Sequence, residues 1–205
     1  MKPISKASVY LYCAFIGSFS VLILPAYSIA EASNSEQASI TISTSQVDGV
    51  QYVSARTLVH FTPQYFLALM SSSHENCEWM DNCKSVTLLE HRANNEQLIQ
   101  THIDAPWPFK DRDMVVTSRS EYDSESNILS IFIEDASDQI PLHPKLVRMT
   151  DVNGKWQIKP LNGLYELSYT GTANPNGNIP STFALSFMQD STQKTFENLQ
   201  ALNTN

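Results

Sequence analysis

The chain has 205 residues, of which 13 are basic and 21 are acidic, so its formal net charge is −8 at neutral pH. Binding to a phosphate backbone needs a cluster of lysine and arginine, and the sequence has none, so the composition argues against a nucleic-acid partner. The length is sufficient for one domain with a full hydrophobic core.

The N-terminus predicts a signal peptide over residues 1–30. Lys2 and Lys6 precede an apolar run, Val9–Leu24, and Ser28-Ile29-Ala30 supplies the small residues that a signal peptidase recognises. The run is short for a membrane span, although an uncleaved N-terminal anchor is the alternative. A cleaved signal peptide indicates an exported protein, either periplasmic or secreted.

The remaining chain is predicted to be a flexible linker over residues 31–39 and one domain over residues 40–205. Cleavage would leave 11 basic and 21 acidic residues, a net charge of −10. Cys77 and Cys83 would then be its two cysteines, and in an oxidising compartment we expect them to form a disulfide. A zinc site with His74 is the alternative, but it would have only three ligands.

The middle of the chain predicts a short helix and a series of strands. Thr62-Pro63 is typical of a helix start, and apolar residues repeat at helical spacing as far as Met70. Period-two patterns predict strands, with turns at Asp48-Gly49, Asn94-Asn95, Asn153-Gly154 and Asn162-Gly163. The strands are Ile40–Thr44, Gln51–Val59, Ser85–Arg92, Glu96–Ile103, Asp113–Tyr122, Ile128–Glu134, Leu146–Val152, Lys155–Leu161 and Leu164–Thr172. We expect an antiparallel sheet of consecutive neighbours.

The last segment, Ser181–Leu202, predicts one long amphipathic helix. Its apolar stripe contains Ala184, Leu185, Met188, Thr192, Thr195, Phe196, Leu199 and Leu202. Its polar side contains Gln189, Asp190, Gln193, Lys194, Glu197 and Gln200. A curved sheet is the only large surface that could cover this stripe, so the predicted fold is α+β, with a sheet wrapped around a helix.

Motifs for catalysis are absent from the sequence. It contains no GxSxG, HExxH, glycine-rich phosphate loop or CxxC, and its five histidines are scattered. Asp111 and Asp113 could form a catalytic carboxylate pair, but with Arg112 between them we prefer a salt-bridged start of a strand. No catalytic residue, cofactor or metal is therefore predicted.

Five segments, in this order, resemble the START family of lipid-transfer domains. They are the Trp79 and Cys83 segment, the block "APWPFKDRD" (Ala105–Asp113), the Arg148 strand, Trp156 with Pro160, and the terminal "TFENLQAL". The resemblance covers about Gln51 to Leu202. It implies a helix-grip fold whose terminal helix closes an apolar tunnel holding a sterol, phospholipid or other hydrophobic molecule. In the block, we expect the prolines to end sheet pairing, and Trp107 and Phe109 to fill the resulting corner.

The resemblance also implies where a ligand would bind. The loop Glu134–Lys145 would lie over the tunnel mouth beside the terminal helix, with Ile140 and Leu142 in a gate. Simple packing of these side chains under a surface loop is the alternative. Several family members place an arginine in the tunnel where this chain has Ser118, so Gln100 and His102 would hydrogen-bond a weakly polar ligand instead. The predicted ligand contacts are Gln100, His102, Val116, Ser118, Ile140, Leu142, Arg148, Met188, Thr192, Thr195 and Leu199. The helix stripe could equally be tight core packing.

These observations predict a monomer that binds, and transfers, a hydrophobic ligand without chemical change and contacts membranes transiently. Two alternatives remain open. One is a helix-grip enzyme acting on a hydrophobic substrate, with His102 as its polar group, and the other is a filled protein-interaction module without a ligand.

Overall fold

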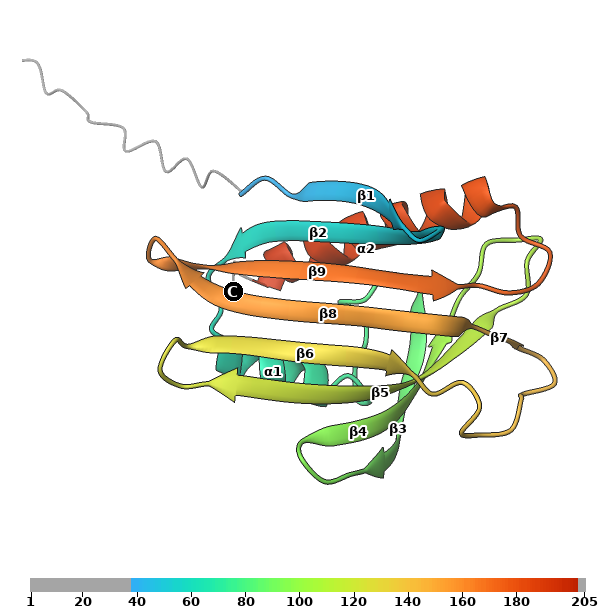
Figure 1. Ribbon diagram of the computed structural model, residues 1–205, viewed down its shortest axis with the longest axis horizontal. Coiled ribbons are helices and arrows are strands. Elements are labelled where there is room, and N and C mark those ends of the chain that lie inside the picture. Colours follow the sequence, from blue (N-terminus) through green and yellow to red (C-terminus); the bar gives the residue numbers. More distant parts are fainter. Residues whose placement is uncertain (1–37, 203–205) are drawn as a thin grey trace, which may run out of the picture. The chain divides into compact units, whose positions relative to one another are not determined.

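The computed structural model describes residues 38–202, which form nine strands and two helices (Figure 1). The predicted signal peptide and residues 31–37 of the predicted linker lie outside this range. The elements are β1 (Thr41–Val47), β2 (Val50–Val59), α1 (Pro63–Ser71), β3 (Cys83–His91), β4 (Glu96–Ile103), β5 (Arg112–Asp123), β6 (Ile128–Asp135), β7 (Val147–Arg148), β8 (Thr150–Leu161), β9 (Leu164–Asn174) and α2 (Ser181–Ala201).

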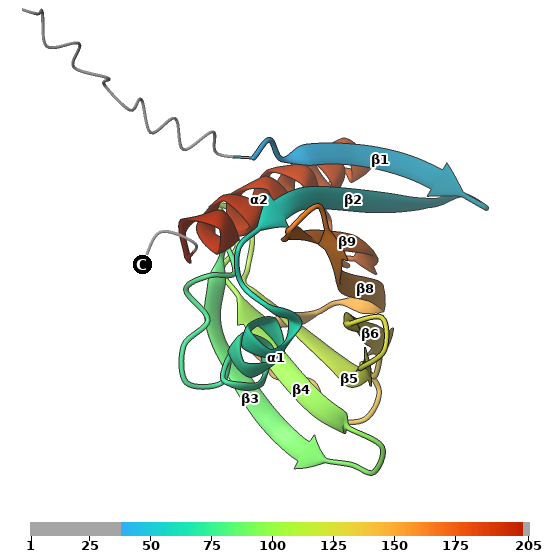
Figure 2. The same cartoon turned by 90° about the vertical axis from the view of Figure 1, so that its left-hand side faces the viewer.

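One curved sheet contains all nine strands, in the order β1-β2-β9-β8-β6-β5-β4-β3, with the short β7 beside β5. Figure 2 shows the sheet curving from β1 round to β3, with α1 and α2 on its concave side. The predicted α+β helix-grip architecture is confirmed. The expectation of consecutive neighbours is wrong at three places, because β2 pairs with β9, β6 pairs with β8, and β7 runs parallel to β5.

Local sequence signals set most of the predicted boundaries. The turns at Asp48-Gly49, Asn94-Asn95 and Asn162-Gly163 all have left-handed backbone angles, which asparagine, aspartate and glycine tolerate best. Thr62 caps α1, because its hydroxyl accepts a hydrogen bond from the backbone N–H of Tyr65 at 3.2 Å.

The predicted hairpin around Asn153-Gly154 is wrong, because β8 runs through both residues. Gly154 lies opposite Gly171 of β9 and Ile133 of β6, in the middle of the sheet. A Cβ at Gly154 would lie only 3.3 Å from the ring of Tyr169. This glycine therefore marks a close approach between a ring and the backbone, and not a turn.

The core is centred on Trp156 of β8. Its ring centroid lies 4.5 Å from that of Tyr169, 5.5 Å from Phe66 of α1, 5.6 Å from Phe196 of α2 and 6.3 Å from Trp79. This aromatic cluster joins the sheet to both helices. It fills the concave side beside β8, β9 and the C-terminal half of α2.

Cys77 and Cys83 form a disulfide, as predicted, and the loop that it closes packs on α2. The backbone N–H of Asp81 donates to the Thr195 hydroxyl at 3.0 Å, and the amide of Asn198 donates to the carbonyl of Trp79 at 3.4 Å. The cross-link therefore holds a loop that fixes the C-terminal half of the terminal helix.

We expect reduction of this disulfide to lower the free energy of unfolding by about 2 kcal/mol, because the closed loop is short and constrains the unfolded chain only modestly. Urea denaturation with and without dithiothreitol measures the change. A Cys77→Ser/Cys83→Ser variant should be insensitive to the reductant, and an equal response in that variant would contradict the prediction.

Gln200 departs from the predicted polar side of the terminal helix. Its side chain is buried, and its amide donates to the Thr57 hydroxyl of β2 at 2.6 Å and also to the carbonyl of Ala38. The buried hydrogen bond to Thr57 joins the C-terminal end of α2 to β2. Within residues 38–202, neither helix has the length and apolar character needed to cross a membrane.

Candidate functional site

The register of the sheet separates the predicted ligand contacts onto two faces. Ile131 lies in the core and is opposite Ser120 of β5, so even-numbered residues of β5, including Val116 and Ser118, point to the concave side. Gln100 lies opposite Val115, and His102 opposite Asp113, so both side chains point to the convex side. The sheet therefore does not bring these predicted contacts together.

Part of the concave face carries apolar side chains that are only half-buried, whereas Trp156 itself and its neighbours Phe66 and Phe196 are buried. The half-buried side chains come from β3, β4, β5 and β6, and they are Val86, Leu88, Ile99, Ile103, Met114 and Ile133. We call this set the concave lining. Val116 lies on the same face and is buried. The lining retains accessible apolar surface on the inner side of the sheet.

The stripe of α2 shows the same change along its length. Thr195, Phe196 and Leu199 are fully buried, and the Thr195 hydroxyl is occupied by Asp81. Met188 and Thr192 are half-buried, and the Thr192 hydroxyl donates to the Met188 carbonyl at 2.7 Å. The C-terminal half of the stripe is therefore tight core, whereas the N-terminal half keeps accessible surface.

Tyr169 lies at the boundary between these two regions. Its side chain runs along β9 over Gly171, where a Cβ would overlap the tyrosine hydroxyl, and beside Gly154. Burial raises the pKa of the Tyr169 phenol to about 12, yet the residue keeps some accessible surface. Within residues 38–202 its hydroxyl makes no hydrogen bond.

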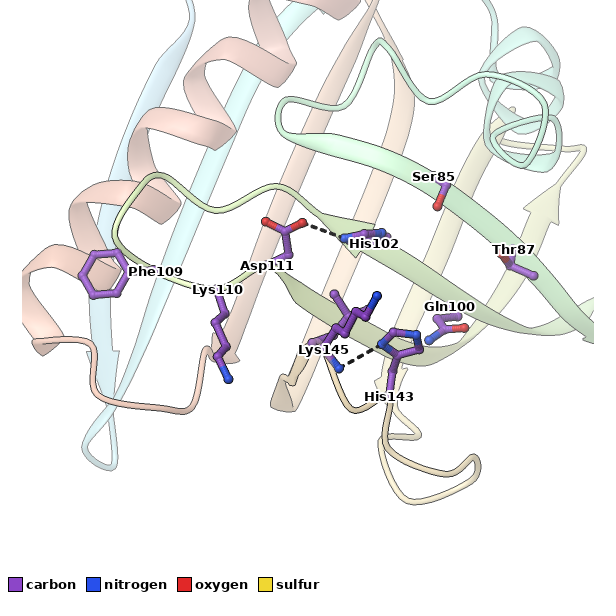
Figure 3. A pocket seen from close by; sticks show the side chains of 10 residues that line it. Ser85, Thr87, Gln100, His102, Phe109, Lys110, Asp111, His143 and Lys145 are labelled. Carbon is purple, nitrogen blue, oxygen red and sulfur yellow. Dashed lines mark hydrogen bonds and ion pairs between the residues drawn. The ribbon is translucent and has the colours of Figure 1, made fainter.

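A separate groove lies on the convex face, with a volume of about 480 Å³ (Figure 3). Gln100 and His102 line it, together with Ser85 and Thr87 of β3 and with Asp111. His102 Nε2 lies 3.0 Å from Asp111 Oδ2. Within the described residues no hydrogen bond joins His102 to either hydroxyl, so the groove contains no assembled nucleophile and base.

Asp111 is held as a carboxylate at the edge of this groove. A hydrogen bond from Lys84 Nζ at 2.8 Å is the main cause that lowers the pKa of the Asp111 carboxyl, and His102 and the backbone N–H of Ala105 add to it against the effect of burial. Because the folded-state pKa lies below the unfolded value, this contribution to stability is present above about pH 4 and is lost as the pH falls through the folded pKa.

We therefore expect Asp111→Asn to lower the free energy of unfolding by about 1 kcal/mol at neutral pH, and the difference from wild type to close under acidic conditions. Denaturant titrations across acidic pH would measure this. Asp138→Asn, an exposed aspartate in a nearby loop, is the control and should follow wild type throughout. A gap that persists at low pH would count against the prediction.

Arg148 lies in a buried ion pair with Asp113 on the convex side. Its Nη2 and Nε lie 2.7 and 3.0 Å from Asp113 Oδ2, and its Nη1 donates to the carbonyls of Ser137 and Ile140. Burial alone would raise the pKa of Asp113, but hydrogen bonds from Arg148 and Gln100 outweigh it and lower the pKa. The guanidinium of Arg148 is thus occupied by protein groups.

The loop Glu134–Lys145 packs on this convex side, which differs from its expected position beside the terminal helix. Ala136 and Ile140 join Leu98 and Val115 in a small apolar cluster, while Leu142 is 72% exposed. Arg148 also holds the loop on this face, because its guanidinium donates hydrogen bonds to three backbone carbonyls of the loop.

The loop that contacts the start of α2 is instead the Pro-Trp-Pro block. Phe109 packs on Phe183 in the first turn of α2, with ring centroids 5.0 Å apart. The peptide between Trp107 and Pro108 is cis. Trp107 does not fill the corner as predicted, because it is 92% exposed, and Phe109 alone does so.

The sequence did not single out Tyr169, Gly171 or Arg112 as site residues. The preferred interpretation of "DRD" as a salt-bridged start of a strand is confirmed, although both cations come from other elements and not from Arg112. Strand alternation sends both aspartates to the convex side, where Lys84 pairs with Asp111 and Arg148 with Asp113. Alternation alone predicts that Arg112 points to the opposite face from the two aspartates. It does not identify the cations that pair with Asp111 and Asp113.

No protein-family model matches the sequence. The uncharacterized protein PA1579 of Pseudomonas aeruginosa is 27% identical over 135 residues, which are 65% of this chain and 66% of that protein, just under two thirds of its length. Among solved structures, a STAR-related lipid transfer protein from Xanthomonas axonopodis superposes with a TM-score of 0.73 and 21% identity, over 81% of this chain and 94% of that chain.

Two human proteins are similar at the level of structure. STARD10 has a TM-score of 0.68 and 15% identity, over 79% of this chain and 68% of its own. StAR-related lipid transfer protein 5 has a TM-score of 0.68 and 15% identity, over 80% of this chain and 81% of its own. The described chain therefore has the helix-grip fold of START domains, as its sequence motifs predicted. At these identities the likeness defines the fold, while the ligand must be argued from this chain's own residues.

Proposed function

We propose that this protein binds a hydrophobic molecule between the concave lining and the N-terminal half of α2, and carries it without chemical change. The observation that carries the proposal is the accessible apolar surface on the inner side of the sheet, beside the buried cluster centred on Trp156. Each Å² of apolar ligand surface removed from water contributes about 25 cal/mol, so an acyl chain or sterol would gain several kcal/mol there. The names of the solved structures with this fold support the same class of ligand.

Of the predicted contacts, those on the inner side are the ones we retain for this ligand. They are Val116, Ser118, Met188 and Thr192, together with the concave lining and Tyr169. Gln100, His102, Ile140 and Arg148 lie on the other face of the sheet. An enzyme that used His102 would therefore need its substrate in the convex groove and not in the interior.

Native mass spectrometry of the protein purified from its own host tests the proposal. We expect a bound species with a mass of hundreds of daltons that is released on denaturation. Met188→Trp should remove it, because an indole at this half-buried position fills the space beside the lining. Ser186→Trp, on the exposed side of the same helix, is the matched control and should retain the species. Wild-type protein without a bound species and without affinity for any added lipid would refute the proposal.

Export and transient membrane contact belong to the same proposal. The disulfide suits an oxidising compartment, where a carrier would cross an aqueous space. Trp107 is an exposed aromatic side chain on the loop that contacts the first turn of α2, and such side chains favour a membrane interface. Loss of vesicle binding in Trp107→Ala, with ligand binding intact, is the expected result.

A further inference from the structure

Arg112 is a buried cation without a carboxylate partner. It lies between Asp111 and Asp113 at the start of β5, but its side chain points to the concave side, opposite to theirs. Only 5% of its surface is accessible, and its Nε has no hydrogen-bond partner. This arrangement is unusual, because arginine is almost never fully buried unless it is paired.

The charges that could neutralise Arg112 are committed elsewhere. Asp111 accepts hydrogen bonds from Lys84 and His102, and Asp113 accepts them from Arg148. Among residues 38–202 no ion pair includes Arg112, whose Nη1 donates only to the carbonyl of Lys110. Burial is the main cause that lowers the pKa of this guanidinium, and Asp111 opposes it only at a distance. The protein therefore bears the desolvation cost of a cation without its compensation.

The surroundings of Arg112 connect the concave lining to the first turn of α2. Ile103 of the lining lies directly opposite it on β4, and Met114 is the next residue on the same face of β5. The guanidinium lies 5.8 Å from the ring centroid of Phe109, whose ring also packs on Phe183 of α2. A Cβ at Gly177, in the connection from β9 to α2, would lie 3.7 Å from Nη2.

The N-terminus of α2 adds positive potential at this end of the interior. Pro180 occupies the N-cap position and makes no side-chain hydrogen bond to the helix, and the first turn has no acidic residue. The free N–H groups and the helix dipole of a 21-residue helix both favour an anion there. The uncapped first turn of α2 contains Phe183, and the unpaired Arg112 lies beside Phe109, which packs on Phe183. Both groups would be stabilised by an anion.

We propose that Arg112 binds the anionic head group, a carboxylate or a phosphate, of an amphiphile whose apolar tail lies against the concave lining. The inference rests on the proposed function and specifies its ligand class. It revises the expectation of a weakly polar ligand, which followed from the serine at position 118: the interior does hold an arginine, six residues earlier on the same face. The ligand anion supplies the counter-charge that the protein lacks, so binding recovers the desolvation cost of the guanidinium.

The test compares ligands that differ only in the head group: dodecanoate, dodecyl phosphate and dodecanol, titrated below their micelle concentrations by calorimetry. We expect wild-type protein to bind at least one of the two anions about 10- to 100-fold more tightly than the alcohol, the range for hydrogen bonds to charged groups. Arg112→Met should abolish this preference and leave the affinity for dodecanol unchanged. Arg119→Met, which removes a more exposed arginine of the same strand, should keep the preference.

The outcomes separate the two levels of the proposal. Binding of all three ligands with equal affinity overturns the head-group site and leaves the proposed function standing. Failure to bind any of them overturns the head-group site, and it overturns the proposed function as well if native mass spectrometry also finds no bound species. Acetate and inorganic phosphate are the short-chain controls. If they raise the melting temperature of wild type as much as the long-chain anions do, the site binds small anions, and the proposal of an amphiphilic ligand is overturned. Which long-chain anion binds more tightly distinguishes fatty acid from phospholipid chemistry. If Arg112→Met does not fold, the comparison of the three ligands on wild type still tests the proposal. Arg112→Lys then replaces Arg112→Met as the variant, and we expect its preference for the anions over dodecanol to be weaker than that of wild type.

Discussion

Arg148→Met is expected to lower the free energy of unfolding by about 3–5 kcal/mol, because it leaves Asp113 buried without its cation. Asp113 is 1% exposed, and its Oδ2 accepts hydrogen bonds from Arg148 and Gln100. The substitution also frees the backbone carbonyls of Ser137 and Ile140, so the loop Glu134–Lys145 should exchange its amide hydrogens faster. Chemical denaturation and hydrogen exchange measure the two effects.

The pH dependence identifies the cause. In wild type the pKa of Asp113 is lowered, so this stabilisation is lost as the pH falls. In Arg148→Met the unpaired buried carboxyl has a raised pKa and gains stability on protonation, so the deficit should shrink in acid. Asp113→Leu/Arg148→Met should be more stable than Arg148→Met alone, and Arg119→Met should cost at most about 1 kcal/mol. A loss in Arg148→Met no larger than in Arg119→Met would show that the ion pair does not stabilise the fold.

Trp156→Ala is the second large effect, with an expected loss of about 3–5 kcal/mol in the free energy of unfolding. Its ring contacts Tyr169, Phe66, Phe196 and Trp79, so the cavity left by its removal opens between the sheet and both helices. No single neighbour can move to fill it without breaking another contact. Thermal and urea denaturation measure the loss.

Trp107→Ala is the matched control, since the same side chain is removed from a position that is 92% exposed. We expect its stability to stay within about 0.5 kcal/mol of wild type. Similar losses at the two tryptophans would mean that the aromatic cluster is not the centre of the core.

The sequence predicted most elements of the fold because their signals are local. The Thr62 cap, the asparagine and glycine turns, and the amphipathic Ser181–Leu202 segment each depend on residues within a few positions. The hairpin at Asn153-Gly154 failed because the need for Gly154 comes from Tyr169, a neighbour across the sheet. Strand order failed for the same reason, since β2 and β9 are far apart in the sequence and their pairing, for example Val53 opposite Gly171, leaves no local signal.

The candidate site was less predictable than the fold. Period-two alternation assigns residues to faces, but the choice of concave face for Val116 and convex face for His102 needs the register between strands. Arg112 shows the limit most clearly. In the sequence, its two aspartate neighbours suggest ion pairs with Arg112. In the structure, these aspartates pair instead with Lys84 and Arg148, which lie 27 and 35 residues away from them.

The attachments of α2 are concentrated at one end. Thr195 and Asn198 bind the disulfide loop, and Gln200 binds Thr57, whereas the first turn has Phe183 against Phe109 and no cap. Local opening of the first turns would therefore cost far less free energy than unfolding the domain, because it leaves the rings around Trp156 undisturbed. The ligand that we propose would therefore enter and leave beside the first turns of α2, where few contacts must break, while the contacts of Thr195, Asn198 and Gln200 keep the helix attached to the domain.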